Sequence, residues 1–138
     1  MRLLLPIMTA LHRWLYRLTD GRLGGSVASM PVLLLTTTGR KTGARRTVPL
    51  SFFEDGEAYV LIGSRGGAPK HPSWYLNLEA HPDVEVQVGA ERRRLRARRA
   101  SAEEAERLWP PILERAPTYG KYRARTRREI PLVLLERR

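Results

Sequence analysis

Short apolar runs alternate with polar, glycine- or proline-containing segments along the chain, a pattern that predicts strands joined by tight turns. Asp55-Gly56 and Gly89-Ala90-Glu91 supply the turn signals of two hairpins. Pro49 removes a ladder hydrogen bond from its run, so we expect it at an edge, in a bulge, or where the backbone faces a ligand. The expected strands are residues 31–39, two runs within 45–64, two within 83–99, and 130–136.

Helical patterns occur between these runs. Ser101 and Glu104 form a capping box that opens a helix towards Trp109, where Pro110-Pro111 is expected to interrupt or kink it. Two shorter helices are expected within residues 72–82 and 117–130.

The first 25 residues have the 3.6-residue periodicity of an amphipathic helix. Arg2, Pro6 and Arg13 interrupt their apolar run, so this segment is too polar to span a bilayer, which requires about 20 apolar residues. Two interpretations remain open: a helix packed on its own domain, or a helix resting on an anionic membrane surface.

Strands dominate, and neighbouring strands pair through hairpins. This predicts a mainly β (α+β) fold in which an antiparallel sheet closes into a small barrel with helices packed outside. A chain of 138 residues, 42% of them apolar, is large enough for one domain with its own core. We therefore expect an amphipathic helix in residues 1–25 and a single barrel domain in residues 26–138.

The formal net charge is +11, which predicts anionic partners: nucleic acid, a membrane surface, or a phosphorylated or carboxylated small molecule. The absence of cysteine excludes disulfides and thiolate chemistry and is compatible with a reducing cytoplasm. His12, His71 and His81 lack the spacing of a metal site, so we expect no metal.

Part of this charge follows the predicted strand at the end of the second hairpin. Arg92, Arg94, Arg96 and Arg98 alternate with other residues and therefore share one face, which we interpret as solvated. No nucleic-acid-binding motif accompanies them, so we expect no nucleic-acid partner.

Three stretches carry candidate chemistry. "TTTGRKTGARRTVPL", residues 36–50, is either a solvated hairpin tip or a cradle of amides and cations for an anion. "GSRGGAPKHPSWYLNL", residues 63–78, combines glycines at a strand end with Trp74, which is either a core anchor or one wall of a slot for a ring. "APTYGKYRARTRR", residues 116–128, places Tyr119 and Tyr122 on one helical face as hydrogen-bond or proton donors.

Together, "LLLTTTGRKTGARRTVPL", "DGEAYVLIGSRGGAPKHPSWYLNLEAHPDVEVQV" and "RTRREIPLVLLE" closely resemble the deazaflavin-dependent nitroreductase family, whose members use coenzyme F420. The resemblance covers most of the chain from about residue 31 onward. It implies a split β-barrel similar to those that bind flavins, and a cofactor with a phosphate and an oligoglutamate tail.

The resemblance also implies residue roles. Arg40, Lys41 and Thr42 would hold the phosphate and acidic tail. Tyr119 would lie over the reaction centre and Ser64 would orient the substrate, whereas Ala116 removes one aromatic wall that some members have. The remaining cofactor-binding residues implied are Arg46, Thr47, Val48, Pro49, Leu50, Ser51, Ile62, Gly63, Ser64, Arg65, Ser73, Trp74, Tyr75, Leu76, Asn77 and Tyr119.

The function implied is an F420-dependent reductase that transfers a hydride to a small-molecule acceptor such as a quinone, an enone or a nitro compound, with Tyr119 or water supplying the proton. An FMN-dependent enzyme of the same barrel type and a non-catalytic deazaflavin-binding protein are the alternatives. We expect a cytoplasmic protein. If residues 1–25 form the membrane-surface helix of the second interpretation, the protein would contact the inner face of the cell membrane peripherally. A homodimer would agree with the barrel type.

Overall fold

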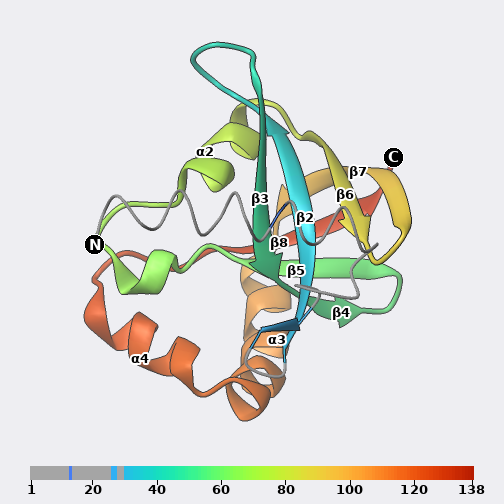
Figure 1. Cartoon of the computed structure of the whole chain (residues 1–138). Coiled ribbons are helices and arrows are strands. Elements are labelled where there is room, and N and C mark those ends of the chain that lie inside the picture. Colours follow the sequence, from blue (N-terminus) through green and yellow to red (C-terminus); the bar gives the residue numbers. More distant parts are fainter. Residues whose placement is uncertain (1–12, 14–25, 28–29) are drawn as a thin grey trace.

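The computed structural model describes Arg13, Ser26–Val27 and residues 30–138 (Figure 1). The amphipathic helix predicted for residues 1–25 lies outside the described residues except for Arg13, whose Nη1 donates to the carbonyl oxygen of Thr47 at 2.6 Å. The strands are β1 (Ser26–Val27), β2 (Met30–Thr38), β3 (Arg45–Ser51), β4 (Phe53–Asp55), β5 (Ala58–Ile62), β6 (Asp83–Val88), β7 (Glu91–Arg99) and β8 (Leu132–Arg137). The helices are the 3₁₀ turn η1 (Arg65–Gly67), α2 (Ser73–Ala80), α3 (Ala102–Arg115) and α4 (Thr118–Arg125).

A corner at Phe52 makes the sheet curl. Every strand pair is antiparallel, and the order is β1-β2-β6-β7-β8-β5-β4, with β3 on the other side of β2. β3 and β4 therefore lie at opposite edges of the sheet, although only Phe52 separates them in the chain. This short connection forces the sheet to bend round into a split barrel. We predicted one continuous run here; the structure divides it because Phe52 leaves β3, and its N–H donates to the Pro31 carbonyl at 3.1 Å.

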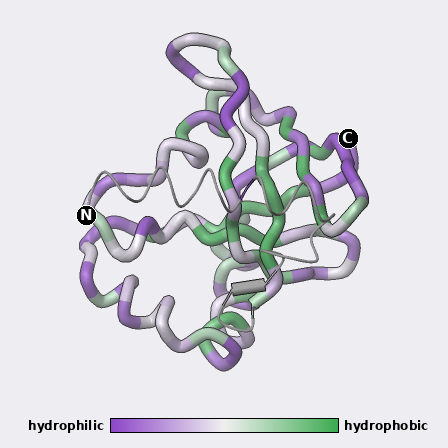
Figure 2. Tube along the Cα trace, viewed as in Figure 1, coloured by the Kyte–Doolittle hydropathy of each residue, from purple (hydrophilic) through white to green (hydrophobic). Residues whose placement is uncertain are grey.

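β5 and β8 separate two apolar layers. Leu61, Val133 and Leu135 point into the barrel, whereas their neighbours point outward beneath α3 and α4. Since both faces of these strands are covered in the centre of the molecule, the sequence is apolar over 60–62 and 132–135, before the polar Glu136 and Arg137 end β8. Figure 2 shows hydrophobic segments gathered at this centre. The outward layer comprises Met30, Phe53, Val60, Ile62, Leu108, Trp109, Ile112, Ile130, Leu132 and Leu134.

α3 runs through Pro110 and Pro111 to Arg115. Of the two effects predicted for these prolines, an interruption or a kink, the interruption was wrong. Proline removes N–H donors but fixes φ at a helical value. Trp109 and Ile112 are buried against the sheet on either side of the prolines, and this packing compensates for the missing hydrogen bonds.

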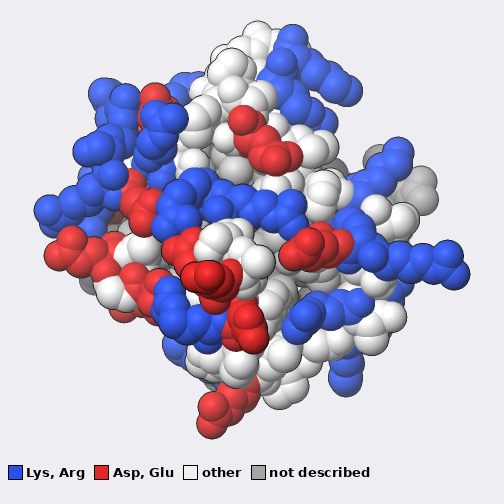
Figure 3. Space-filling view, turned by 180° about the vertical axis from the view of Figure 1, so that it is seen from behind, with Lys and Arg blue, Asp and Glu red and all other residues white. Residues whose placement is uncertain are grey.

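The arginine face of β7 is exposed, as predicted: Arg92, Arg94, Arg96 and Arg98 all lie at the surface. Figure 3 shows cationic and acidic side chains interspersed over this side of the molecule. Such mixing is typical of a solvated surface rather than of a single-sign patch that would track a nucleic-acid backbone.

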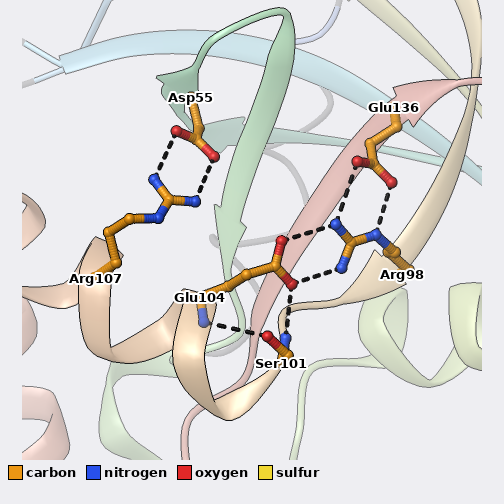
Figure 4. Close-up of polar contacts among 6 residues, drawn as sticks. All are labelled: Asp55, Arg98, Ser101, Glu104, Arg107 and Glu136. Carbon is orange, nitrogen blue, oxygen red and sulfur yellow. Dashed lines mark hydrogen bonds and ion pairs between the residues drawn. The ribbon is translucent and has the colours of Figure 1, made fainter.

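Arg98 also helps to fasten α3 to the sheet (Figure 4). Its guanidinium donates to Glu104 at 2.7 and 2.8 Å and to Glu136 of β8 at 2.7 and 3.3 Å. Glu104 simultaneously completes the capping box with Ser101, as the sequence predicted. The hydrogen bonds from Arg98 and then from Ser101 lower the pKa of Glu104 to about 2.

We expect Glu104→Gln to destabilise the fold at neutral pH by about 1 kcal/mol, a value kept small because the pair is partly exposed. Since the pKa of Glu104 is about 2 in the folded state, below its ordinary value of 4.5, its contribution is present above pH 4.5 and is lost as the pH falls towards 2. Urea unfolding of both proteins from pH 7 to pH 2.5 would therefore show two stabilities that converge. Glu103→Gln, one residue away and without a described ion pair, is the control. A difference that stays constant with pH would contradict this.

Candidate functional site

The hairpin between β2 and β3 projects beyond the sheet (Figure 1). Two main-chain hydrogen bonds shape it: Gly39 N–H donates to Ala44 O at 2.7 Å, and Gly43 N–H donates to Gly39 O at 2.8 Å. Gly43 has φ +73°, a left-handed conformation that glycine adopts readily. The exposed side chains of Arg40, Lys41 and Thr42 are thereby gathered at one tip.

Asn77 of α2 ties this hairpin to the barrel. Its Oδ1 accepts from the Arg40 N–H at 3.1 Å and from Arg40 Nη1 at 2.8 Å, while its Nδ2 donates to Thr37 Oγ1 at 3.3 Å. Only 5% of Asn77 is exposed, so its amide forms a buried junction between β2, the hairpin and α2. The resemblance placed Asn77 in the binding site, and the structure shows its contacts to be within the protein.

A groove of about 430 Å³ lies between the hairpin and α2. Arg40, Lys41 and Arg46 contribute three cations to its lining, and none of the described lining residues is a carboxylate. Because uncompensated cations beside hydroxyl groups favour phosphate and carboxylate ligands, this donor set fits an anionic group. The lining residues are Thr37, Gly39, Arg40, Lys41, Thr42, Arg46, Val48, Ser73, Trp74 and Asn77.

Trp74 is 9% exposed in the core cluster, as the core interpretation predicted, and it also lines the groove. Its role as one wall of a slot for a ring stays a prediction. Tyr75 does not line the groove: it is 1% exposed, its ring packs in the core, and burial raises the pKa of its hydroxyl. Its hydroxyl oxygen is buried and has no hydrogen-bond partner among the described residues. Leu76 packs against the same core and is likewise absent from the groove lining.

β3 connects this groove to a second group of candidate residues. Among described residues β3 pairs with β2 alone, which confirms the edge position predicted from Pro49. Arg46 and Val48 line the groove, whereas Ser51 lies at the far end of the strand, about 17 Å from Arg46 at 3.3 Å per residue. Thr47, Pro49 and Leu50 lie between them and are half-buried.

Tyr119 of α4 meets β3 at this far end. Burial and then the neighbouring Tyr122 raise the pKa of Tyr119, while a side-chain hydrogen bond with Ser51 lowers it. Its ring packs edge-on against Tyr122 at 5.8 Å and against Phe53 at 6.3 Å. With its pKa above the ordinary value of 10, the phenol keeps its proton throughout the neutral range.

The end of β5 lies beside α4. Ile62, Gly63 and Ser64 are buried there, and Arg65 is exposed with φ +46°. A Cβ on Gly63 would lie 2.8 Å from Cγ of Pro131, so only glycine allows this approach. Arg128 binds the carbonyl groups of this segment, a role that the sequence did not reveal, although "RTRREIPLVLLE" contains the residue.

No cluster of metal-ligating side chains occurs in the part of the chain that the structure describes. Within the same residues, no helix has the length and apolar character needed to cross a membrane.

A split barrel with a cationic groove at one end of an edge strand and a protonated tyrosine at the other suits a protein that binds an elongated, anionic redox cofactor. A family model described as "F420H(2)-dependent quinone reductase" matches residues 8–137. The chain belongs to this family, which makes it an F420-dependent reductase with coenzyme F420 as its cofactor.

Individual relatives agree with this assignment. An F420H(2)-dependent quinone reductase of Mycobacterium tuberculosis is 44% identical over 132 residues, which cover 93% of this chain and 89% of the relative. A solved F420-H2-dependent reductase (FDR-A) is 43% identical with a TM-score of 0.70, covering 77% of this chain and 94% of that one. A structure described as a domain-swapped dimer is 40% identical with a TM-score of 0.74, covering 92% and 94% of the two chains.

We expect Asn77→Ala to destabilise the protein by about 1–3 kcal/mol, because it leaves the Arg40 N–H and the Thr37 hydroxyl without their buried acceptor and donor. Hydrogen exchange at the Arg40 amide should also accelerate relative to β5. Ser73→Ala is the matched control, since Ser73 contacts Arg40 through its main-chain oxygen. Unchanged exchange at Arg40 in Asn77→Ala would show that Asn77 does not hold the hairpin.

Proposed function

We propose that the chain reduces a quinone with coenzyme F420 bound along β3, its acidic tail in the cationic groove and its ring near Tyr119. The observation that carries this proposal is the pairing of two features of one strand: a groove at one end that holds Arg40, Lys41 and Arg46 and has no carboxylate among its described lining residues, and a half-buried tyrosine at the other end. The roughly 17 Å between Arg46 and Ser51 suits an elongated cofactor rather than a compact one.

Reduced F420 supplies a hydride from ring carbon 5 when it is bound. The chain's own residues then have three tasks: to grip the tail, to orient the ring against the acceptor, and to provide a proton. The quinone gains the hydride and one proton, and the hydroquinone leaves.

Tyr119 is proposed to donate that proton from its hydroxyl, because a phenol carries its proton at neutral pH and burial raises the pKa of Tyr119 further. Its hydrogen bond with Ser51 orients the hydroxyl towards the end of β3. Ser64 is 7% exposed at the end of β5 and is proposed to orient the acceptor. Ala116 is half-buried against the outer apolar layer and gives the acceptor more room than a tyrosine would.

We also propose that the protein forms a homodimer and contacts the membrane. A homodimer agrees with the domain-swapped dimer found for a 40% identical chain. Peripheral membrane contact through residues 1–25 would bring a cytoplasmic protein close to lipid-soluble quinones in the membrane.

Lys41→Glu should weaken F420 binding by tenfold or more, about 1.4 kcal/mol, because it replaces an attractive charge in the groove by a repulsive one. Titration of the oxidised coenzyme, followed by its fluorescence, measures this directly. Arg92→Glu makes the same charge reversal on the exposed β7 face and should change affinity far less. Equal losses in both variants would indicate general electrostatics, and preferential uptake of FMN by the unaltered protein would favour the FMN-dependent alternative.

Tyr119→Phe should lower kcat with quinones by about 10²-fold, within the usual range for loss of a proton donor, while F420 affinity stays within about twofold. Stopped-flow oxidation of the reduced coenzyme would provide both quantities. Tyr122→Phe removes the neighbouring hydroxyl and serves as the control. If the unaltered protein binds F420 tightly but oxidises it with no acceptor, the chain is a deazaflavin-binding protein instead.

A further inference from the structure

Arg128 lies in the connection between α4 and β8, and all three of its guanidinium nitrogens contact the segment between β5 and α2. Nε donates to Ala68 O at 2.9 Å, Nη2 donates to Ser64 O at 2.8 Å, and Nη1 donates to Gly63 O at 3.1 Å. Nη1 also lies 3.1 Å from Nδ1 of His71. One side chain therefore holds four points of residues 63–71.

These contacts are unusual for an arginine because no carboxylate takes part. Arg128 forms no ion pair with any residue that the structure describes. Burial, followed by the nearby Arg65, lowers its pKa. A half-buried cation without a counter-ion is costly, and hydrogen bonds to four acceptors offset that cost only while the segment keeps its present shape. The shape of residues 63–71 and the position of Arg128 are thus mutually dependent.

The same region is joined to α4 at a second point. A Cβ on Gly67 would lie 2.8 Å from the Tyr122 carbonyl oxygen, so this glycine lets α4 approach η1 closely. The chain around α4 therefore meets this region at two points. The middle of α4 approaches Gly67 closely, and Arg128, just beyond the end of α4, binds the segment by hydrogen bonds. Ser64 immediately precedes η1 and Tyr119 lies in the first turn of α4, and no hydrogen bond joins their side chains in the described part of the structure.

We propose that Arg128 is a positioning residue for hydride transfer, which sets Ser64 and Tyr119 at the separation that the reaction requires. This inference rests on the proposed function. Arg128 acts through the backbone of residues 63–71, because its guanidinium is occupied by those acceptors and is not available to the acceptor substrate.

His71 makes this arrangement sensitive to pH. Arginine always donates, so His71 accepts through Nδ1 and carries its proton on Nε2. The charged groups that influence His71 are Arg128, Glu79 of α2 and Arg99 of β7, and its ring packs 4.8 Å from Tyr75. Burial and then Arg128 lower the pKa of His71 below its ordinary 6.5. Protonation would replace a hydrogen bond by two facing cations and loosen the segment.

The principal test compares Arg128→Lys with Arg127→Lys in full-length protein loaded with F420. Lysine keeps the charge but is a single ammonium that cannot reach four divergent acceptors. For Arg128→Lys we expect kcat with a quinone to fall by at least about tenfold, while the Kd for F420 changes by less than about threefold because the hairpin groove is intact. Arg127→Lys alters an exposed neighbour and should change neither value.

Two further measurements separate positioning from stability alone. Guanidinium ions, added to Arg128→Ala well below denaturing concentrations, should restore part of kcat without changing the Kd for F420. In the unaltered protein kcat should decline below pH 6.5, whereas His71→Asn, whose Oδ1 accepts from Arg128 at every pH, should lose that decline.

The outcomes distinguish this inference from the proposed function. A protein that reduces quinones but whose Arg128→Lys variant keeps its kcat within twofold of the unaltered protein would overturn the role of Arg128 alone. A lower melting temperature with unchanged kcat for the folded fraction would do the same. An identical acid decline in His71→Asn would overturn the pH sensitivity assigned to His71. An unaltered protein that oxidises no reduced F420 would instead overturn the proposed function.

Discussion

The bend of the sheet at Phe52 determines where everything else in this protein lies. β3 and β4 are neighbours in the chain but end opposite sides of the sheet order, and the buried Phe52, with its N–H bonded to Pro31, makes the change of direction. Without this bend β3 would continue away from β5 and α4. With it, the strand that begins beside the cationic groove ends beside Tyr119, so one edge strand joins the two halves of the proposed site.

The cationic side chains of this chain serve two purposes: some hold parts of the fold together, and others line the groove. The difference lies in which groups accept their hydrogen bonds. Arg98 and Arg107 are bonded to carboxylates and fasten α3, and Arg128 is bonded to backbone carbonyls and fastens a loop. Lys41 and Arg46 instead face a groove whose described lining has no carboxylate. The positive charge of the sequence is therefore divided between internal fastening and a cradle for an anion.

The proposed site combines a rigid part with parts whose position depends on single contacts. β2 and β3 form a long ladder, so residues along β3 are fixed by the sheet itself. The hairpin depends on the Asn77 amide, and the segment after β5 depends on Arg128. Orientation of cofactor and acceptor, which is the protein's main contribution to cofactor chemistry, consequently depends on these two polar side chains.

The sequence by itself determined the features that depend on near neighbours: the two hairpins, the capping box of Ser101 and Glu104, and the cationic turn after β2. Its close resemblance to a known family also led to the correct cofactor. Only the tertiary structure decided that α3 would pass through two prolines, that Tyr75 would be buried in the core, and that Arg128 would fasten residues 63–71. The acceptors of Arg128 are 57–65 residues away in the chain, and no local pattern of residue types encodes a contact at that separation. Periodicity and capping act over a few residues, whereas burial and hydrogen bonding between distant segments exist only after the barrel has closed.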